Sequence, residues 1–154
     1  MLSPTLSSMR PIAEDRFAKS FDSLDPVFAF LERALARVTG NRTYDQIFAL
    51  AVEEFFTNMV KYHPEGQSPI AVRVFLNGTE LSVALADEGV EPYDVTSAPE
   101  PDLDAPLDER RVGGLGIHLS KALLDGIEYR HDNGTSTVTL KKNLEPDDVL
   151  NQQE

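Results

Sequence analysis

Glu54 and Asn58 lie four residues apart in an apolar stretch, and their types and spacing could support chemistry at a phosphate group. Residues at positions i and i+4 share one face of a helix. An amide oxygen is a suitable ligand for the hard cation Mg²⁺, and a carboxylate can accept a proton or orient water. The pair is equally typical of a helix edge that reaches solvent, so both interpretations stay open at this point.

Asp87 and Gly89 form a second short motif, at the end of a run of alternating apolar residues. An acidic residue at this place either begins a turn or accepts a hydrogen bond from a ligand in a pocket. Glycine allows the flat ring of a ligand to approach the backbone closely. On its own, the motif is compatible with both roles.

Three glycines, Gly113, Gly114 and Gly116, precede a predicted helix. Backbone N–H groups at such a place can converge on an anion, with help from the positive end of the helix dipole. The glycines are also suited to be the hinge of the preceding loop, and the two roles are compatible. Arg111 could pair with phosphate or balance the acidic residues upstream. The pattern is neither a P-loop nor a Rossmann fingerprint.

Composition excludes several classes of function. The chain of 154 residues has no cysteine, which excludes disulfide scaffolds, thiolate nucleophiles and zinc–thiolate sites. Its three histidines lack metal-ligand spacing, and no nucleophile elbow supports serine hydrolysis. A net charge of −12 argues against a general binder of nucleic acid or of anionic membranes. No apolar run approaches the ~20 residues of a membrane span, so we expect a cytoplasmic protein.

The elements that must position these motifs follow from periodicity and turn signals. Their order predicts an α+β fold, a two-layer sandwich with helices on one face of a mixed, mostly antiparallel sheet. The expected elements are a weak strand at residues 17–21, helices at 23–40 and 43–62, a hairpin at 70–85 that turns at Asn77-Gly78, and a helix at 117–123. A final hairpin is expected from strands at 127–131 and 136–142, which flank an Asp132-Asn133-Gly134 turn.

The chain is expected to form one domain over residues 13–142. Residues 1–12 are predicted to be disordered, and residues 143–154 to form a frayed acidic tail. Between Asp87 and Glu109 the sequence has nine acidic residues and no basic one. So long a segment without periodicity is typical of a lid or binding loop, which we place at residues 90–112.

In this order, the motifs resemble those of the ATP-binding fold shared by gyrase, histidine kinases and MutL, the GHKL or histidine kinase-like ATPase superfamily. Within it, the chain is most similar to bacterial anti-sigma serine kinases of the RsbW type. Glu54 and Asn58 match the Glu-x-x-x-Asn helix motif, Asp87 and Gly89 match the Asp-x-Gly box, and Gly114-Leu115-Gly116 matches the later glycine box.

This resemblance covers roughly residues 14–142 and implies ATP or ADP and Mg²⁺ as cofactors. It implies that Glu54 is the catalytic base, that Asn58 ligates Mg²⁺ and that Asp87 accepts a hydrogen bond from the adenine amino group. The implied nucleotide-binding residues are Asn58, Lys61, Asp87, Gly89, Arg111, Gly113, Gly114, Leu115, Gly116 and Ser136, with Thr135 and Thr137 as alternatives to Ser136.

The leading hypothesis is an ATP-dependent kinase that phosphorylates a serine on an anti-anti-sigma partner of the STAS type. The resemblance further implies a possible sigma-factor partner and a possible homodimer. The net charge of −12 and the lack of an apolar run of membrane-spanning length predict no direct contact with nucleic acid or membrane. The alternative is a switch in which bound nucleotide changes the capture of a partner without phosphorylation. A plain structural domain is the third hypothesis.

Overall fold

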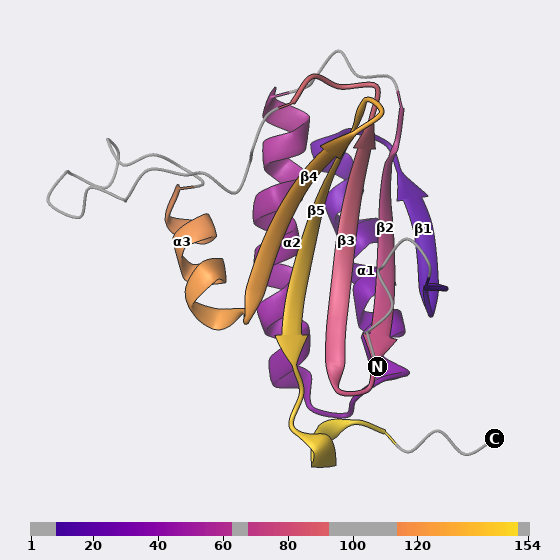
Figure 1. Ribbon diagram of the computed structural model, residues 1–154, viewed down its shortest axis with the longest axis vertical. Helices are drawn as coiled ribbons and strands as arrows, with labels where there is room; N and C mark the ends of the chain where they lie inside the picture. Colours follow the sequence, from indigo (N-terminus) through magenta and orange to yellow (C-terminus); the bar gives the residue numbers. More distant parts are fainter. Residues whose placement is uncertain (1–8, 63–67, 93–113, 151–154) are drawn as a thin grey trace, which may run out of the picture.

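A computed structural model describes residues 9–62, 68–92 and 114–150. It shows a five-stranded sheet in the order β1-β2-β3-β5-β4, with α1 and α2 on one face and α3 beside α2 (Figure 1). The strands are β1 (Ala13–Phe17), β2 (Ile70–Asn77), β3 (Glu80–Glu88), β4 (Gly126–Asp132) and β5 (Thr135–Asn143), and the helices are α1 (Leu24–Ala36), α2 (Arg42–Tyr62) and α3 (Gly114–Leu123). Every strand pair in this sheet is antiparallel. The predicted two-layer α+β fold is confirmed.

The core lies between the sheet and the two long helices. Phe48, Phe55 and Phe56 of α2 are completely buried, as are Val27 and Leu35 of α1. Phe55 and Phe56 follow Phe48 by seven and eight residues, and Leu35 follows Val27 by eight, so these side chains form one stripe on each helix that faces the sheet. The stripe holds α2 flat against the strands, and this placement fixes the direction of its polar side chains.

Two hairpins connect the paired strands. Asn133 (φ 53°) and Gly134 (φ 79°) join β4 to β5, and positive φ at both loop positions is typical of a type I′ turn. The pairing of Asn77 with Glu80 leaves Gly78 and Thr79 as the loop between β2 and β3. Both hairpins were predicted. The turn between β2 and β3 lies one residue later in the chain than the expected Asn77-Gly78 turn.

Strand pairing decides which side chains face the helices. Ile70 is completely buried on the helix side of β2, and it pairs with Asp87 of β3. Asp87 in turn pairs with Ser136 of β5. Because directly paired residues point to the same side of a sheet, Asp87 and Ser136 both point toward the helical layer.

The predicted first strand is wrong in position. β1 ends at Phe17, and Phe21 is half exposed in the short 3₁₀ helix η2 (Phe21–Ser23). The Ser20 side chain accepts a hydrogen bond from the Asp22 amide, and the Ser23 hydroxyl donates to the Ala18 carbonyl oxygen at 2.7 Å. Such local side-chain bonds favour a turn over a strand.

Packed structure also extends past both expected domain boundaries. The Ile12 amide donates to the Val74 carbonyl oxygen at 2.7 Å, before the expected start at residue 13. At the other end, Leu144 is 3% exposed and the Leu150 amide donates to the Val38 carbonyl oxygen at 2.7 Å. The prediction of a frayed tail is therefore wrong for residues 144–150, because an apolar anchor and backbone bonds hold them.

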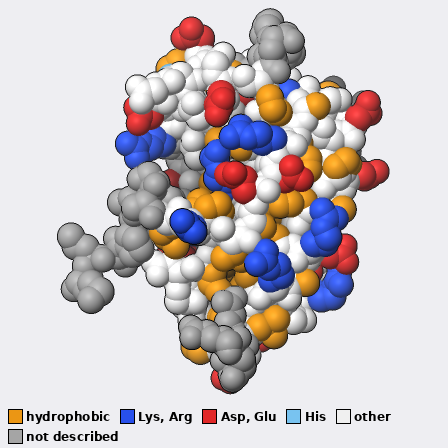
Figure 2. Space-filling view, turned by 90° about the vertical axis from the view of Figure 1, so that its right-hand side faces the viewer, with side chains coloured by type: hydrophobic (Ala, Val, Ile, Leu, Met, Phe, Trp, Pro, Cys, Tyr) orange, Lys and Arg blue, Asp and Glu red, His pale blue; other side chains and the backbone are white. Residues whose placement is uncertain are grey.

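Charges of both signs lie close together on the side of the molecule that carries β1 (Figure 2). Arg73 pairs with Glu14, and Arg16 lies 3.8 Å from Glu88. Surface ion pairs of this kind contribute little stability, ~0–1 kcal/mol each. In the part of the chain that is described, no helix is long and apolar enough to cross a membrane.

Candidate functional site

Helix α2 presents Glu54 and Asn58 one turn apart, as the sequence predicts. Asn58 is 5% exposed, and Glu54 is partly buried. The Glu54 Oε1 atom is buried and receives no hydrogen bond from any residue that the structure describes. A carboxylate oxygen removed from water in this way is available to a proton or a ligand donor. The interpretation of Glu54 as a solvated helix edge is therefore not supported.

The first turn of α3 lies directly against Glu54. A Cβ atom at Gly116 would collide with the Glu54 carboxylate, so only glycine leaves room for that side chain in its present position. The Ser120 hydroxyl donates to the Gly116 carbonyl oxygen at 2.8 Å and ties this turn to the next one. The glycine box and the Glu-x-x-x-Asn motif thus meet where α2 contacts α3.

The environment of Glu54 raises its pKa above the ordinary glutamate value. Burial is the largest cause, the Lys61 ammonium opposes it, and the like charge of Glu53 adds to it. A carboxyl group with a raised pKa is a stronger base once it is ionised. This is the direction that a proton-accepting role requires.

The end of β3 supplies a second group of polar side chains. Asp87 is completely buried, and its Oδ1 lies 2.6 Å from the Lys19 Nζ. Ser136, 4% exposed, pairs with Asp87, and its Oγ lies 3.2 Å from the Tyr129 hydroxyl. The buried side chains of Asp87, Lys19 and Ser136 therefore come together at one end of the sheet, with the Tyr129 hydroxyl beside Ser136.

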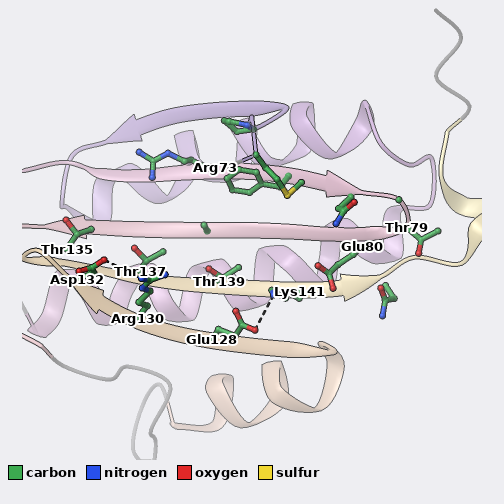
Figure 3. A pocket seen from close by; sticks show the side chains of 17 residues that line it. Arg73, Thr79, Glu80, Glu128, Arg130, Asp132, Thr135, Thr137, Thr139 and Lys141 are labelled. Atoms are coloured by element: carbon green, nitrogen blue, oxygen red, sulfur yellow. Dashed lines mark hydrogen bonds and ion pairs between the residues drawn. The ribbon is translucent and has the colours of Figure 1, made fainter. Parts of the chain in front are cut away.

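Strand alternation decides between the three candidate hydroxyls. Ser136 points to the helix side with Asp87, whereas Thr135 and Thr137 line a hollow on the opposite face of the sheet. Figure 3 shows the two threonines there, on the same face as Arg130 and Lys141. Ser136 is thus the hydroxyl that shares its side of the sheet with Asp87.

Gly89 follows Asp87 in a conformation that favours glycine. Its φ is +72°, in the left-handed region that other residues rarely adopt. The amides of Gly89 and Val90 both donate to the Gly134 carbonyl oxygen, at 2.8 and 3.1 Å. A Cβ at Gly89 would meet open space, so the conformation alone explains the residue, and the space stays available to a ligand.

The remaining predicted residues are only partly placed. Lys61 is exposed one turn beyond Asn58, and Gly114 and Leu115 open α3. Arg111, Gly113 and most of the expected lid at residues 90–112 lie outside the described residues. Among the described residues, no group of three His, Asp or Glu side chains could hold a metal ion. Asn58 is thus a candidate Mg²⁺ ligand with no such group beside it in the part of the chain that the structure describes.

Two residues of this region were not predicted as site residues, namely Lys19 and Tyr129. Lys19 was assigned to the first strand, where an alternating pattern would have placed it with the apolar side chains. Nothing in its neighbours signals an ion pair with a residue 68 positions away, because only the pairing of β1 with β2 and of β2 with β3 brings them together.

A hollow of about 1150 Å³ lies on the face of the sheet that the described helices leave uncovered (Figure 3). Arg73, Arg130 and Lys141 line it, and the Lys141 Nζ lies 3.2 Å from a Glu128 carboxylate oxygen. It contains neither Glu54, Asn58 nor Asp87. We therefore place the functional site in the cluster between helices and sheet and not in this hollow.

Residues 17–142 match the family described as "Histidine kinase-like ATPase domain". The matched span contains each of Glu54, Asn58, Asp87, Gly116 and Ser136. The fold agrees: the crystal structure of the RsbU and RsbW domains of a Mycobacterium tuberculosis protein superposes with a TM-score of 0.60 and 19% identity, over 88% of this chain and 32% of that one.

Relatives of similar length share more of the sequence. The serine-protein kinase RsbW of Bacillus cereus (strain AH187) is 32% identical over 139 residues, covering 77% of this chain and 81% of that protein. RsbW of Listeria monocytogenes serovar 1/2a is 31% identical over 105 residues, and the match spans only 62% of that relative's length. The chain belongs to the histidine kinase-like ATPase family and, within it, to the RsbW type of serine-protein kinases.

Proposed function

We propose that this protein transfers the γ-phosphoryl group of ATP to a serine hydroxyl on a partner protein. The observation that carries the proposal is the position of Glu54, a partly buried carboxylate that contacts the first turn of α3 and lies one helical turn from Asn58. The relatives named serine-protein kinases support the same reaction.

Each group of the site has a part in this reaction. The Glu54 carboxylate would accept the proton of the serine hydroxyl while the serine oxygen forms a bond to the γ-phosphorus. The bond from that phosphorus to the bridging oxygen breaks, and its electron pair leaves with ADP. Asp87 would accept a hydrogen bond from the adenine amino group, with Ser136 beside it, and the amides that open α3 would donate to the phosphates.

Asn58 fits a role as Mg²⁺ ligand by its chemistry. Asn58 is 5% exposed and lies one turn from a carboxylate, and Mg²⁺ in phosphate-transfer sites is typically held by one or two protein oxygens plus substrate phosphates. When bound, the ion would neutralise charge on those phosphates. Lys61, one turn further along α2, would add a second positive charge.

The partner that we propose is an anti-anti-sigma protein of the STAS type, with a sigma factor as a second partner. A homodimer is also part of this proposal, by analogy with the family. The compartment would be the cytoplasm, where ATP and these partners occur together. Neither nucleic acid nor membrane is needed for the reaction.

Two variants on one helix face separate chemistry from nucleotide binding. Glu54→Gln keeps the shape and removes the proton acceptor, so ADP affinity should persist while phosphate transfer falls ~10²–10⁴-fold. Asn58→Ala removes the Mg²⁺ ligand, so affinity and transfer should both fall, and added Mg²⁺ should partly restore them. Calorimetric titration with ADP and phosphate incorporation into a serine-bearing partner measure the two effects.

Glu53→Gln is the matched control, because it removes one negative charge from the exposed neighbouring position of α2. It should keep both affinity and transfer at neutral pH. Transfer by Glu54→Gln at the wild-type rate would show that Glu54 is not the base. Nucleotide-dependent capture of the partner without any phosphorylation would favour the switch instead.

A further inference from the structure

Lys19 forms an ion pair with Asp87 in the region where we propose that adenine binds. The Lys19 Nζ lies 2.6 Å from Asp87 Oδ1, and the two side chains are only 3% and 0% exposed. Asp87 is the residue that the proposed function assigns to the adenine amino group. A second charged side chain at hydrogen-bond distance from it is therefore within reach of the same base.

The backbone around Lys19 is held in place before any ligand binds. Phe17, two residues earlier, is buried and packs edge-to-face on Phe30 with 5.7 Å between ring centroids. The Ala18 carbonyl oxygen accepts from the Ser23 hydroxyl at 2.7 Å and from the Ser20 amide at 2.8 Å. Lys19 thus extends from a fixed turn toward Asp87, and its position is preorganised.

A neighbouring ion pair shows how unusual this burial is. Arg16 and Glu88 join the same two segments of chain, but their side chains are 49% and 48% exposed and 3.8 Å apart. An exposed pair needs little explanation, whereas a buried lysine pays a large desolvation penalty that an ion pair only partly offsets. A gain in stability is therefore a weak explanation for the buried position of Lys19, and recognition of a ligand is a better one.

We propose that Lys19 is a base-recognition residue that donates a hydrogen bond to N1 of adenine while Asp87 accepts from the amino group at C6. An ammonium donor and a carboxylate acceptor side by side match adjacent acceptor and donor positions on the adenine edge. Asparagine reads adenine by the same logic, with one acceptor and one donor on one group. This inference depends on the proposed nucleotide-binding function and adds a specificity residue to it.

The test compares ADP with 1-deaza-ADP, which lacks only the N1 acceptor. Wild-type protein should bind ADP at least about 10-fold more tightly than 1-deaza-ADP, the usual size of one charge-assisted hydrogen bond. Lys19→Met should lower ADP affinity and bind the two nucleotides equally. A purely structural role of Lys19 would instead weaken both nucleotides by the same factor and keep their ratio.

Arg16→Met is the matched control, since it removes a positive charge from the exposed ion pair at the same end of the strand. Its ratio of ADP affinity to 1-deaza-ADP affinity should equal that of the wild-type protein. If Lys19→Met does not fold because Asp87 keeps a buried charge, the comparison of ADP with 1-deaza-ADP in the wild-type protein still tests the inference, because it needs no variant.

Two results would overturn the inference. Equal affinity of the wild-type protein for the two nucleotides would do so without any variant, and an unchanged ratio in the lysine variant would do so as well. If the wild-type protein bound no ADP at all, the proposed function itself would fail, and this result is distinct from either of the others.

Discussion

At the scale of single residues, Glu54 makes the most specific claim about chemistry. Its pKa is raised, chiefly by burial, with Glu53 adding to the shift and Lys61 opposing it. A base works only in its ionised form, so transfer should rise with pH through the pKa of Glu54 and then level off. We expect this acid limb to lie above the ordinary glutamate value of about 4.3. A profile of transfer rate against pH measures it.

Glu53→Gln should move the acid limb to lower pH, because it removes the like charge that raises the pKa of Glu54. Glu54→Gln should abolish the limb altogether. An acid limb that remains in the profile of Glu54→Gln would show that another group titrates there.

The same raised pKa has a consequence for stability. The folded state binds the Glu54 proton more tightly than the unfolded state does. Ionised Glu54 therefore destabilises the fold, and the full penalty applies at pH values above the pKa that Glu54 has in the folded protein. The penalty is absent at pH values below the pKa of glutamate in the unfolded chain, about 4.3. Glu54→Gln should therefore melt at a higher temperature than wild type at neutral pH, and the difference should vanish in acid.

At the scale of elements, the contact between α2 and α3 holds Glu54, the proposed catalytic base, in position. Gly116→Ala should displace the Glu54 carboxylate, because a Cβ at that position would collide with it. The obstructing atoms belong to a flexible side chain, and alanine is a better helix former by about 1 kcal/mol, so the free energy of unfolding should change little. Transfer should fall about 10²-fold, the effect of misplacing a catalytic group. Phosphate incorporation and urea unfolding test the two halves of this prediction.

Gly126→Ala is the control for this substitution, since a Cβ there would meet only ordinary contacts with Lys141 at 3.7 and 3.9 Å. Combining Gly116→Ala with Glu54→Gln should reduce transfer no further than Glu54→Gln alone, because both changes act through one side chain. Wild-type transfer by Gly116→Ala would contradict the contact as a positioning device.

At the scale of the whole molecule, the C-terminal segment closes the lower end of the fold in Figure 1. Asp148 Oδ2 accepts hydrogen bonds from the Tyr44 hydroxyl at 2.9 Å and from the Asn41 side-chain Nδ2 at 3.2 Å. Asp148→Ala should lower the free energy of unfolding by ~1–3 kcal/mol, because it leaves two part-buried donors without their charged acceptor. Urea unfolding measures the change, and ADP affinity should be unaffected.

Asp147→Ala removes an equal charge from the exposed neighbouring position and should leave the stability within ~0.5 kcal/mol of wild type. Equal effects of the two variants would show that net charge matters here and the hydrogen bonds do not.

Local patterns in the sequence determined most of the architecture. The apolar stripes of α1 and α2, the alternation in β2 and β3, and the Asn133-Gly134 turn each depend on residues within a few positions of one another, and all were predicted. The Glu54–Asn58 pair belongs with them, since helical spacing alone puts both side chains on one face. The identification of the family followed from the order of three such motifs.

Only the tertiary structure decided how these pieces meet. The register of β3 on β5 selects Ser136 over Thr135 and Thr137, because a shift of one residue would reverse every side chain. The backbone hydrogen bonds of residues 144–150 to Thr79 and Val38, the close approach of Gly116 to Glu54 and the Lys19–Asp87 pair each join residues far apart in the chain. Periodicity carries no information about such contacts, since they arise from the packing of one element on another.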